Sequence, residues 1–224
     1  MAYAPLQGLR LVLATFAVSL ATFMQVLDTS IANVAIPTIA GDIAVSPQQG
    51  TWIITSFGVS VAIALPLTGW LARRFGEVRL FVVSVLLFTL ASWGCGLAGD
   101  LPTLIAFRVL QGAVAGPMTP LSQSLLLASF PPERKGQALG LWAMTVVVAP
   151  IVGPVLGGYL TDQYSWPWIF YINVPIGLAA AWLTGQTLGD RETPRQRLPV
   201  DVVGMLMLVV WVGADRVARP SNTH

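Results

Sequence analysis

The sequence contains little charge, one cysteine and one histidine, and each shortage excludes a class of function. Only 10% of the 224 residues are charged, whereas 55% are hydrophobic, and the mean hydropathy is +0.73. Cys95, the single cysteine, allows no internal disulfide and no cysteine-based metal site. His224, the single histidine, is the last residue, which argues against metal catalysis and histidine acid–base chemistry. Because no nucleophile–base pair is visible, we expect neither an enzyme nor a bound cofactor.

Alternation of polar and apolar residues is also absent, and the apolar residues form long continuous runs instead. A membrane-spanning helix needs about 20 mostly apolar residues, and six such runs occur. They cover 10–36, 49–71, 80–98, 102–129, 137–160 and 168–187. Continuous runs argue against a β-barrel, whose strands alternate with period two. The first run is too long for a cleavable signal peptide and lacks a small-residue cleavage site. The pattern predicts an all-α, polytopic membrane protein.

The basic residues are expected on one side of the membrane. Loops on that side contain Arg10, Arg73, Arg74, Arg79, Arg134, Lys135, Arg191, Arg195 and Arg197. The charged residues in loops on the opposite side are all acidic, namely Asp42, Asp100 and Asp162. Basic loops face the cytoplasm, so the N-terminus is predicted to be cytoplasmic. Nucleic acid is not an expected partner, because these residues are scattered over short loops.

The runs and loops predict four segments along the chain. These are a six-helix transmembrane bundle (1–188), a cytoplasmic linker (189–200), the start of a seventh helix (201–213) and a polar tail (214–224). The apolar stretch from Val202 to Gly213 would span only about 18 Å as a helix, against a hydrocarbon core of about 30 Å. It lies either at the membrane interface or in a truncated helix, and we favour truncation.

Two charged residues, Asp28 and Arg108, lie well inside apolar runs. A charge at mid-membrane costs roughly 2.5–3.5 kcal/mol on insertion scales, so an intramembrane acid and base indicate a function. At 1.5 Å per residue, both lie roughly 9–12 Å below the outer surface. In contact they would keep each other charged, and protonating Asp28 would break that balance. A static buried ion pair fits the same facts, but we favour coupling of a proton to conformational change.

Polar residues surround both charges on a helical wheel. The first run presents Thr22, Gln25, Asp28, Thr29 and Asn33 on one face, and the fourth presents Arg108, Gln111, Gly112, Gly116, Thr119, Ser122 and Gln123. Lipid would penalise both faces, so they must face protein or water. We predict that Gln25, Asn33, Gln111 and Gln123 line a substrate path. The alternative is simple helix–helix packing through small and polar residues.

The fifth run contains prolines and glycines at close spacing: Pro150, Gly153, Pro154, Gly157 and Gly158. Each proline removes a backbone donor and is expected to bend the helix, while the glycines allow close packing. We interpret this segment as a hinge or seal between two rocking bundles. Simple packing is the alternative interpretation.

Four motifs resemble one family. The segment 27–37 (LDTSIANVAIP) resembles the first-helix motif of the major facilitator superfamily, in its fourteen-helix drug:proton antiporter branch. Residues 108–112 (RVLQG) resemble the fourth-helix motif, whose arginine is implicated in proton transfer, and 153–158 (GPVLGG) resemble the fifth-helix antiporter motif. Residues 166–177 (WPWIFYINVPIG) are similar to the entry into the sixth helix of EmrB/QacA-type multidrug efflux transporters.

One loop departs from the pattern of that superfamily. The usual G-x-L-A-D-R-x-G-R-(R/K) is replaced by GWLARRFGEV at 69–78. Gly69, Arg74 and Gly76 match, but Arg73 replaces the acid and Glu77 replaces a base. The four residues Gly69, Arg73, Arg74 and Gly76 are expected to form a cytoplasmic gating loop, although its charge arrangement cannot be carried over directly.

The resemblance implies a six-helix, three-plus-three inverted-repeat bundle, which we expect to be the truncated N-terminal half of a proton-driven exporter of hydrophobic drugs. It implies a bacterial inner membrane, hydrophobic small-molecule substrates, the proton as coupling ion, and a periplasmic adaptor with an outer-membrane channel as partners. A short internal echo, Gly69-Trp70-Leu71 and Gly158-Tyr159-Leu160, fits such a repeat. The alternative is an inactive fragment or a membrane adaptor without transport activity.

Overall fold

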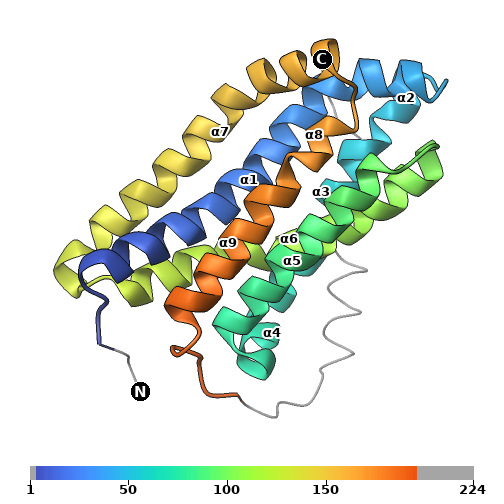
Figure 1. Ribbon diagram of the computed structural model, residues 1–224. Coiled ribbons are helices and arrows are strands. Elements are labelled where there is room, and N and C mark those ends of the chain that lie inside the picture. The colour runs from blue at the N-terminus through green and yellow to red at the C-terminus, as the bar shows by residue number, and fades with distance from the viewer. Residues whose placement is uncertain (1–3, 196–224) are drawn as a thin grey trace, which may run out of the picture.

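The computed structural model describes residues 4–195, and this part of the chain is helical, without any strand (Figure 1). Six stretches are long and apolar enough to cross a membrane: Gly8–Asp42, Pro47–Phe75, Glu77–Gly96, Leu101–Ser129, Pro132–Gln163 and Trp168–Leu188. They coincide with the six predicted runs, which confirms the all-α, multi-pass membrane class. The predicted seventh helix (201–213), the tail (214–224) and residues 196–200 of the linker lie outside the described residues.

Short breaks divide some of these spans into several helices. In chain order the elements are α1 (Gly8–Asp42), α2 (Pro47–Gly50), α3 (Trp52–Ala64), η1 (Leu65–Leu67), α4 (Thr68–Phe75), α5 (Glu77–Gly96), α6 (Leu101–Ser129), η2 (Pro132–Arg134), α7 (Lys135–Gln163), α8 (Trp168–Tyr171) and α9 (Asn173–Leu188). The 3-10 turn η1 contains Pro66, whose missing N–H interrupts the α-helical ladder of the second span.

Local chemistry sets several helix ends. The Asp100 side chain accepts a hydrogen bond from the Thr103 amide (2.8 Å) and begins α6, as an N-cap aspartate does. A capping box of Ser46 and Gln49 begins α2. Gly76, at φ +93°, ends α4 and leads directly into α5, a backbone conformation that glycine adopts without strain.

The helices pack in two groups, and each group combines helices from the first three spans with helices from the last three. Helix α1 packs mainly against α7 and α9, whereas α6 packs mainly against α3 and α5. Contacts between α5 and α9, and between α1 and α6, join the groups (Figure 1). Exchanging the first three spans with the last three leaves this set of contacts unchanged. The packing therefore has the pattern expected of a three-plus-three repeat.

The two ends of the bundle differ in charge. One end, which we call the basic end, contains the start of α1, the α4–α5 turn, the start of α7 and the end of α9, and it includes Arg10, Arg74 and Lys135. The opposite, acidic end contains Asp42 and Asp100. Between them α7 exposes large apolar side chains, including Met144, Val147, Ile151 and Val155. Such a surface requires lipid or further helices as its environment.

Candidate functional site

An ion pair joins α1 to α6 in the interior of the bundle. The Nη1 of Arg108 lies 2.6 Å from Oδ2 of Asp28, and both side chains are fully buried. The structure thus brings together the two charges that the sequence singled out. At full burial the pair is not screened by water, so loss of either charge would leave the other without compensation.

Two amides complete the surroundings of the Asp28 carboxylate. Its Oδ1 accepts hydrogen bonds from Nε2 of Gln111 (3.1 Å) and from Nδ2 of Asn173 (2.7 Å). Together with Arg108, three donors therefore address one carboxylate. All three contacts place a donor against a carboxylate oxygen of Asp28.

Arg108 is held from three further directions. Its Nη1 also donates to Oε1 of Gln111 (2.7 Å), which lies one turn further along α6. Its Nε donates to the Ile53 carbonyl of α3 (3.1 Å), and its guanidinium carbon lies 4.2 Å from the centroid of the Phe57 ring. Cation–π stacking of this kind is strongest where water is excluded. Nη2 has no hydrogen-bond partner among the described residues.

A glycine allows α3 to approach this arginine. A Cβ added at Gly112 would overlap the carbonyl oxygen of Phe57 and would lie 2.8 Å from Cβ of Ser60. The absent side chain therefore lets the backbones of α6 and α3 come close together. That approach brings the Ile53 carbonyl within reach of Arg108.

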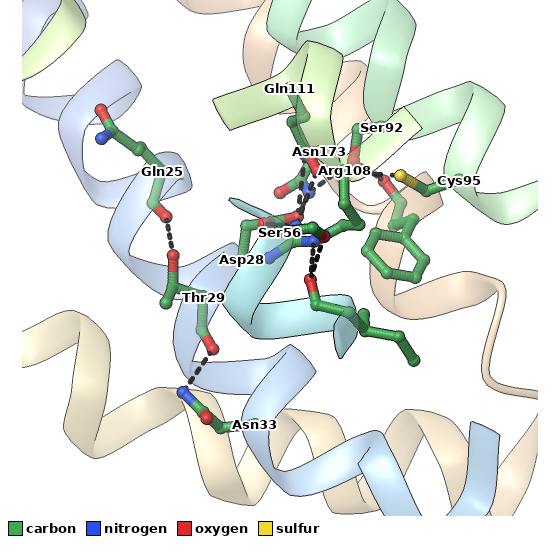
Figure 2. Close-up of polar contacts among 12 residues, drawn as sticks. Gln25, Asp28, Thr29, Asn33, Ser56, Ser92, Cys95, Arg108, Gln111 and Asn173 are labelled. Atoms are coloured by element: carbon green, nitrogen blue, oxygen red, sulfur yellow. Dashed lines mark hydrogen bonds and ion pairs between the residues drawn. The ribbon is translucent and has the colours of Figure 1, made fainter. Parts of the chain in front are cut away.

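Helix α5 supplies an outer set of partners. Asn173 donates to Oγ of Ser92 (2.8 Å), and Ser92 donates to the Phe170 carbonyl (3.0 Å). Sγ of Cys95 lies 3.8 Å from Oε1 of Gln111. We call these six side chains the Asp28 network; Figure 2 shows them converging: Asp28, Ser92, Cys95, Arg108, Gln111 and Asn173. Four helices, α1, α5, α6 and α9, are tied together by this one network.

Of the four predicted lining residues, only Gln111 belongs to the network. Gln25 is buried and accepts a 3.5 Å hydrogen bond from Thr119 of α6. Asn33 is exposed and donates to the Thr29 carbonyl of its own helix (3.0 Å; Figure 2). Gln123 is half-buried. A role of these residues in substrate passage stays a prediction.

The proline–glycine segment of α7 packs against α1. A Cβ at Gly153 would overlap Ser30, and one at Gly157 would lie 3.0 Å from Ile31, whereas Gly158 has open space. Pro154 has no N–H, so the carbonyl of Pro150 lacks its helical donor. The Ser30 hydroxyl lies 3.4 Å from that carbonyl and donates to it. Helix α7 continues through both prolines, and its role as a hinge stays a prediction.

The predicted gating loop forms the end of α4 at the basic end. Nε of Arg73 donates to the Gly69 carbonyl (3.3 Å), and the Arg74 guanidinium lies 5.7 Å from the Trp70 ring centroid. Gly76 supplies the positive φ of the turn, and a Cβ there would overlap the side chain of Glu192. A gating function for these residues stays a prediction.

The described part of the linker lies across this turn. The Glu192 carboxylate accepts from the backbone amides of Val78 (3.1 Å) and Arg79 (2.8 Å), so it caps the N-terminus of α5. Asp190 forms an ion pair with Arg10 of α1. A carboxylate is stabilised at the positive end of a helix dipole. The pattern of side chains in the sequence does not reveal this contact, because Glu192 binds backbone amides.

Comparison with known proteins extends these observations. The family model described as Major Facilitator Superfamily matches residues 18–212. The multidrug export protein EmrB of Haemophilus influenzae is 61% identical over 211 residues, which cover 94% of this chain and 41% of that protein. The fatty acid resistance protein FarB of Neisseria gonorrhoeae is 54% identical over 214 residues, covering 96% and 42% respectively. The chain therefore spans about two fifths of the length of these relatives.

Solved structures agree with the fold. A peptide transporter, POT, matches with a TM-score of 0.74 at 16% identity, covering 96% of this chain and 47% of the transporter. A D-xylose-proton symporter matches with a TM-score of 0.68 at 14% identity, covering 92% and 52%. At such low identity the likeness concerns the fold alone. In both cases the six-helix bundle corresponds to about half of a larger chain.

Proposed function

The chain belongs to the Major Facilitator Superfamily, and we propose on that basis that it supplies the proton-binding six-helix bundle of an exporter. The exporter would move hydrophobic compounds out of the cell in exchange for protons. The relatives named multidrug export protein and fatty acid resistance protein support this substrate class. The observation that carries proton coupling is the fully buried contact between Asp28 and Arg108.

Proton binding at Asp28 would reorganise the interior of the bundle. An O–H bond forms on the carboxylate, and its negative charge disappears. Arg108 then keeps a buried positive charge without its counter-ion, a state that costs several kcal/mol. Relief requires α1 and α6 to change their packing or water to enter. A proton taken up on one side and released on the other would thereby drive a change in access.

The orientation and the partners follow from the same proposal. Basic residues gathered at one end favour a cytoplasmic location of that end in the bacterial inner membrane. Protons would then reach Asp28 from the opposite, acidic end. The residues proposed to line the substrate path are Gln25, Asn33, Gln111 and Gln123. A periplasmic adaptor and an outer-membrane channel are proposed as further partners on the basis of family resemblance.

Reconstituted protein tests the proposal. The chain is inserted into liposomes, a pH gradient is imposed, and movement of ethidium is followed by fluorescence. We expect proton-dependent dye movement that Asp28→Asn abolishes, because the amide binds no proton. Asp42→Asn, which alters an exposed acid at the end of the same helix, serves as the matched control and should leave transport unchanged.

Two results would contradict the proposal. Uphill dye movement by the Asp28→Asn variant would remove Asp28 from proton coupling. Absence of any movement, with insertion and folding verified by circular dichroism, would favour the alternative of a membrane bundle without transport activity of its own.

A further inference from the structure

We propose that Asn173 is a positioning residue whose side-chain amide turns over when Asp28 binds a proton. The inference rests on the proposed role of Asp28 in proton coupling and adds a residue and a direction of transmission to it. Asn173 is the first residue of α9, directly after the α8–α9 junction, and it is fully buried.

The side-chain amide of Asn173 presents its donor, not its acceptor, to the Asp28 carboxylate. Nδ2 of Asn173 donates to Oδ1 of Asp28 (2.7 Å) and to Oγ of Ser92 (2.8 Å). Ser92 uses its own proton on the Phe170 carbonyl, so its oxygen is free to accept. Turning the amide over would point its oxygen at the carboxylate oxygen, and two acceptors repel each other.

The other half of the amide is left unused. Oδ1 of Asn173 is buried and has no hydrogen-bond partner among the described residues. A buried acceptor without a donor is unfavourable. In the observed orientation the Asn173 amide therefore makes two hydrogen bonds through Nδ2 and leaves its acceptor Oδ1 without a partner. Adding a donor on the Asp28 side would reverse that orientation.

Protonation of Asp28 adds such a donor. With a proton on Oδ1 of Asp28, the acid would face the N–H₂ of Asn173, donor against donor. Rotation of the amide by 180° places its oxygen to accept from the new O–H. Ser92 then faces the amide oxygen too, and its hydroxyl can turn from the Phe170 carbonyl to Asn173. Only the proton on Asp28 is gained, and every other change is a rotation.

The consequence appears at the junction between α8 and α9. Turning the Ser92 hydroxyl away removes its hydrogen bond to the Phe170 carbonyl, which lies in α8 three residues before Asn173 begins α9. Protonation of an acid on α1 would thus reach α8 through Asn173 of α9 and Ser92 of α5, along a chain of hydrogen bonds. Residues of α8 and α9 could respond to the proton even though they carry no charge.

Few other titratable or charged groups lie near enough to Asp28 to contribute to its titration. Arg108 faces it from α6, and Cys95 of α5 contacts Gln111. Helices α3 and α9 contain no charged residue. Tyr171 of α8 donates its hydroxyl to the Gly96 carbonyl, and the charged residues of α7, Lys135 and Asp162, lie at its two ends.

Infrared difference spectroscopy of the chain in lipid nanodiscs tests the inference directly. The sequence contains three asparagines, Asn33, Asn173 and Asn222. Replacing Asn33 and Asn222 by alanine leaves Asn173 as the single asparagine, which can be isotope-labelled. Lowering the pH should produce the carboxylic-acid band of Asp28, identified by its loss in Asp28→Asn. The amide band of Asn173 should shift with the same pH midpoint.

A variant series adds a second reading. Asn173→Ala removes a donor to the carboxylate, so the midpoint of the Asp28 band should rise by about one pH unit, or tenfold in proton affinity. Asn173→Gln keeps the amide, so its midpoint should lie between those of the parent and of Asn173→Ala. Thr184→Val is the matched control: Thr184 is buried on the same helix, and its hydroxyl forms no hydrogen bond with any described residue. Its midpoint should equal that of the parent.

The outcomes separate the two proposals. If Asp28 gains a proton but the Asn173 band is silent and Asn173→Ala leaves the midpoint unchanged, the role of Asn173 is wrong while proton coupling stands. If Asp28 never gains a proton over the pH range in which the chain stays folded, both proposals fail. The labelled single-asparagine protein keeps its native Asn173, so this part of the test survives if Asn173→Ala does not fold.

Discussion

Two ion pairs in this bundle use the same chemistry in opposite environments. Arg108 and Asp28 meet with both side chains fully excluded from solvent, whereas the side chains of Arg10 and Asp190 at the basic end keep 44% and 62% of their exposure. Removing one partner of a buried pair strongly destabilises the fold, because an uncompensated buried charge is left behind. Exposed pairs contribute little, because water and salt already solvate each charge.

The difference explains which pair is suited to transmit a signal. Neutralising one member of the buried pair would leave the other charge uncompensated among α1, α5, α6 and α9, which all contribute residues to the Asp28 network. Neutralising one member of the exposed pair leaves the other in water. Contacts at the basic end therefore hold the linker near α1 and α5, while the interior network is the element to which we assign proton coupling.

The largest effect is expected for Arg108→Ala. This change leaves Asp28 buried without its counter-charge, so we expect the free energy of unfolding to fall by about 3–5 kcal/mol. Unfolding would be followed by circular dichroism in mixed micelles with increasing denaturing detergent. The double variant Asp28→Leu/Arg108→Met should recover much of the loss, because it removes both charges and retains apolar volume. A single variant as stable as the parent would contradict the comparison.

An intermediate effect is expected for Gly112→Ala. The new methyl group would overlap the Phe57 carbonyl oxygen, so α3 and α6 must separate, and overpacking of this kind costs about 1–3 kcal/mol. Separation would also lengthen the hydrogen bond from Arg108 to Ile53. Gly58→Ala on α3 is the matched control, since nothing lies within 4 Å of its added Cβ.

The same unfolding assay reads out both glycine variants. The control should be neutral or stabilising by up to about 1 kcal/mol, because alanine is the better helix former. Equal stability losses in the two variants would mean that the close approach of α3 and α6 is not what limits the substitution at Gly112.

Much of the fold follows from the sequence, because each membrane span must hydrogen-bond its own backbone N–H and C=O groups within a helix. The six apolar runs fix the six spans, and the matching depths of Asp28 and Arg108 predict their proximity. Gln111 was also found, since it lies one turn from Arg108 on the same face. These features are either local or set by distance from the membrane surface.

Other parts of the site could not be found in this way. Asn173 was noticed only within a motif, because its rotation about α9 relative to α1 depends on tertiary packing. Ser92 and Cys95 are three residues apart on α5, a weak signal within an apolar run. The wheel placed Asn33 beside Asp28, yet its amide bonds to its own helix. Glu192 escaped notice because its partners are backbone amides.

The smallest effect is expected for Asp190→Ala, which removes the exposed ion pair with Arg10. Arg10 keeps its 3.0 Å hydrogen bond from Nε to the Thr187 carbonyl, and its charge stays in water. We expect a loss of at most about 0.5 kcal/mol, declining further at high salt as the charges are screened. Asp162→Ala, an exposed acid at the acidic end, is the control and should be neutral. A loss above about 2 kcal/mol that persists in high salt would show that the basic end, like the interior, stores its stability in charge pairing, and the contrast between the two regions would then fail.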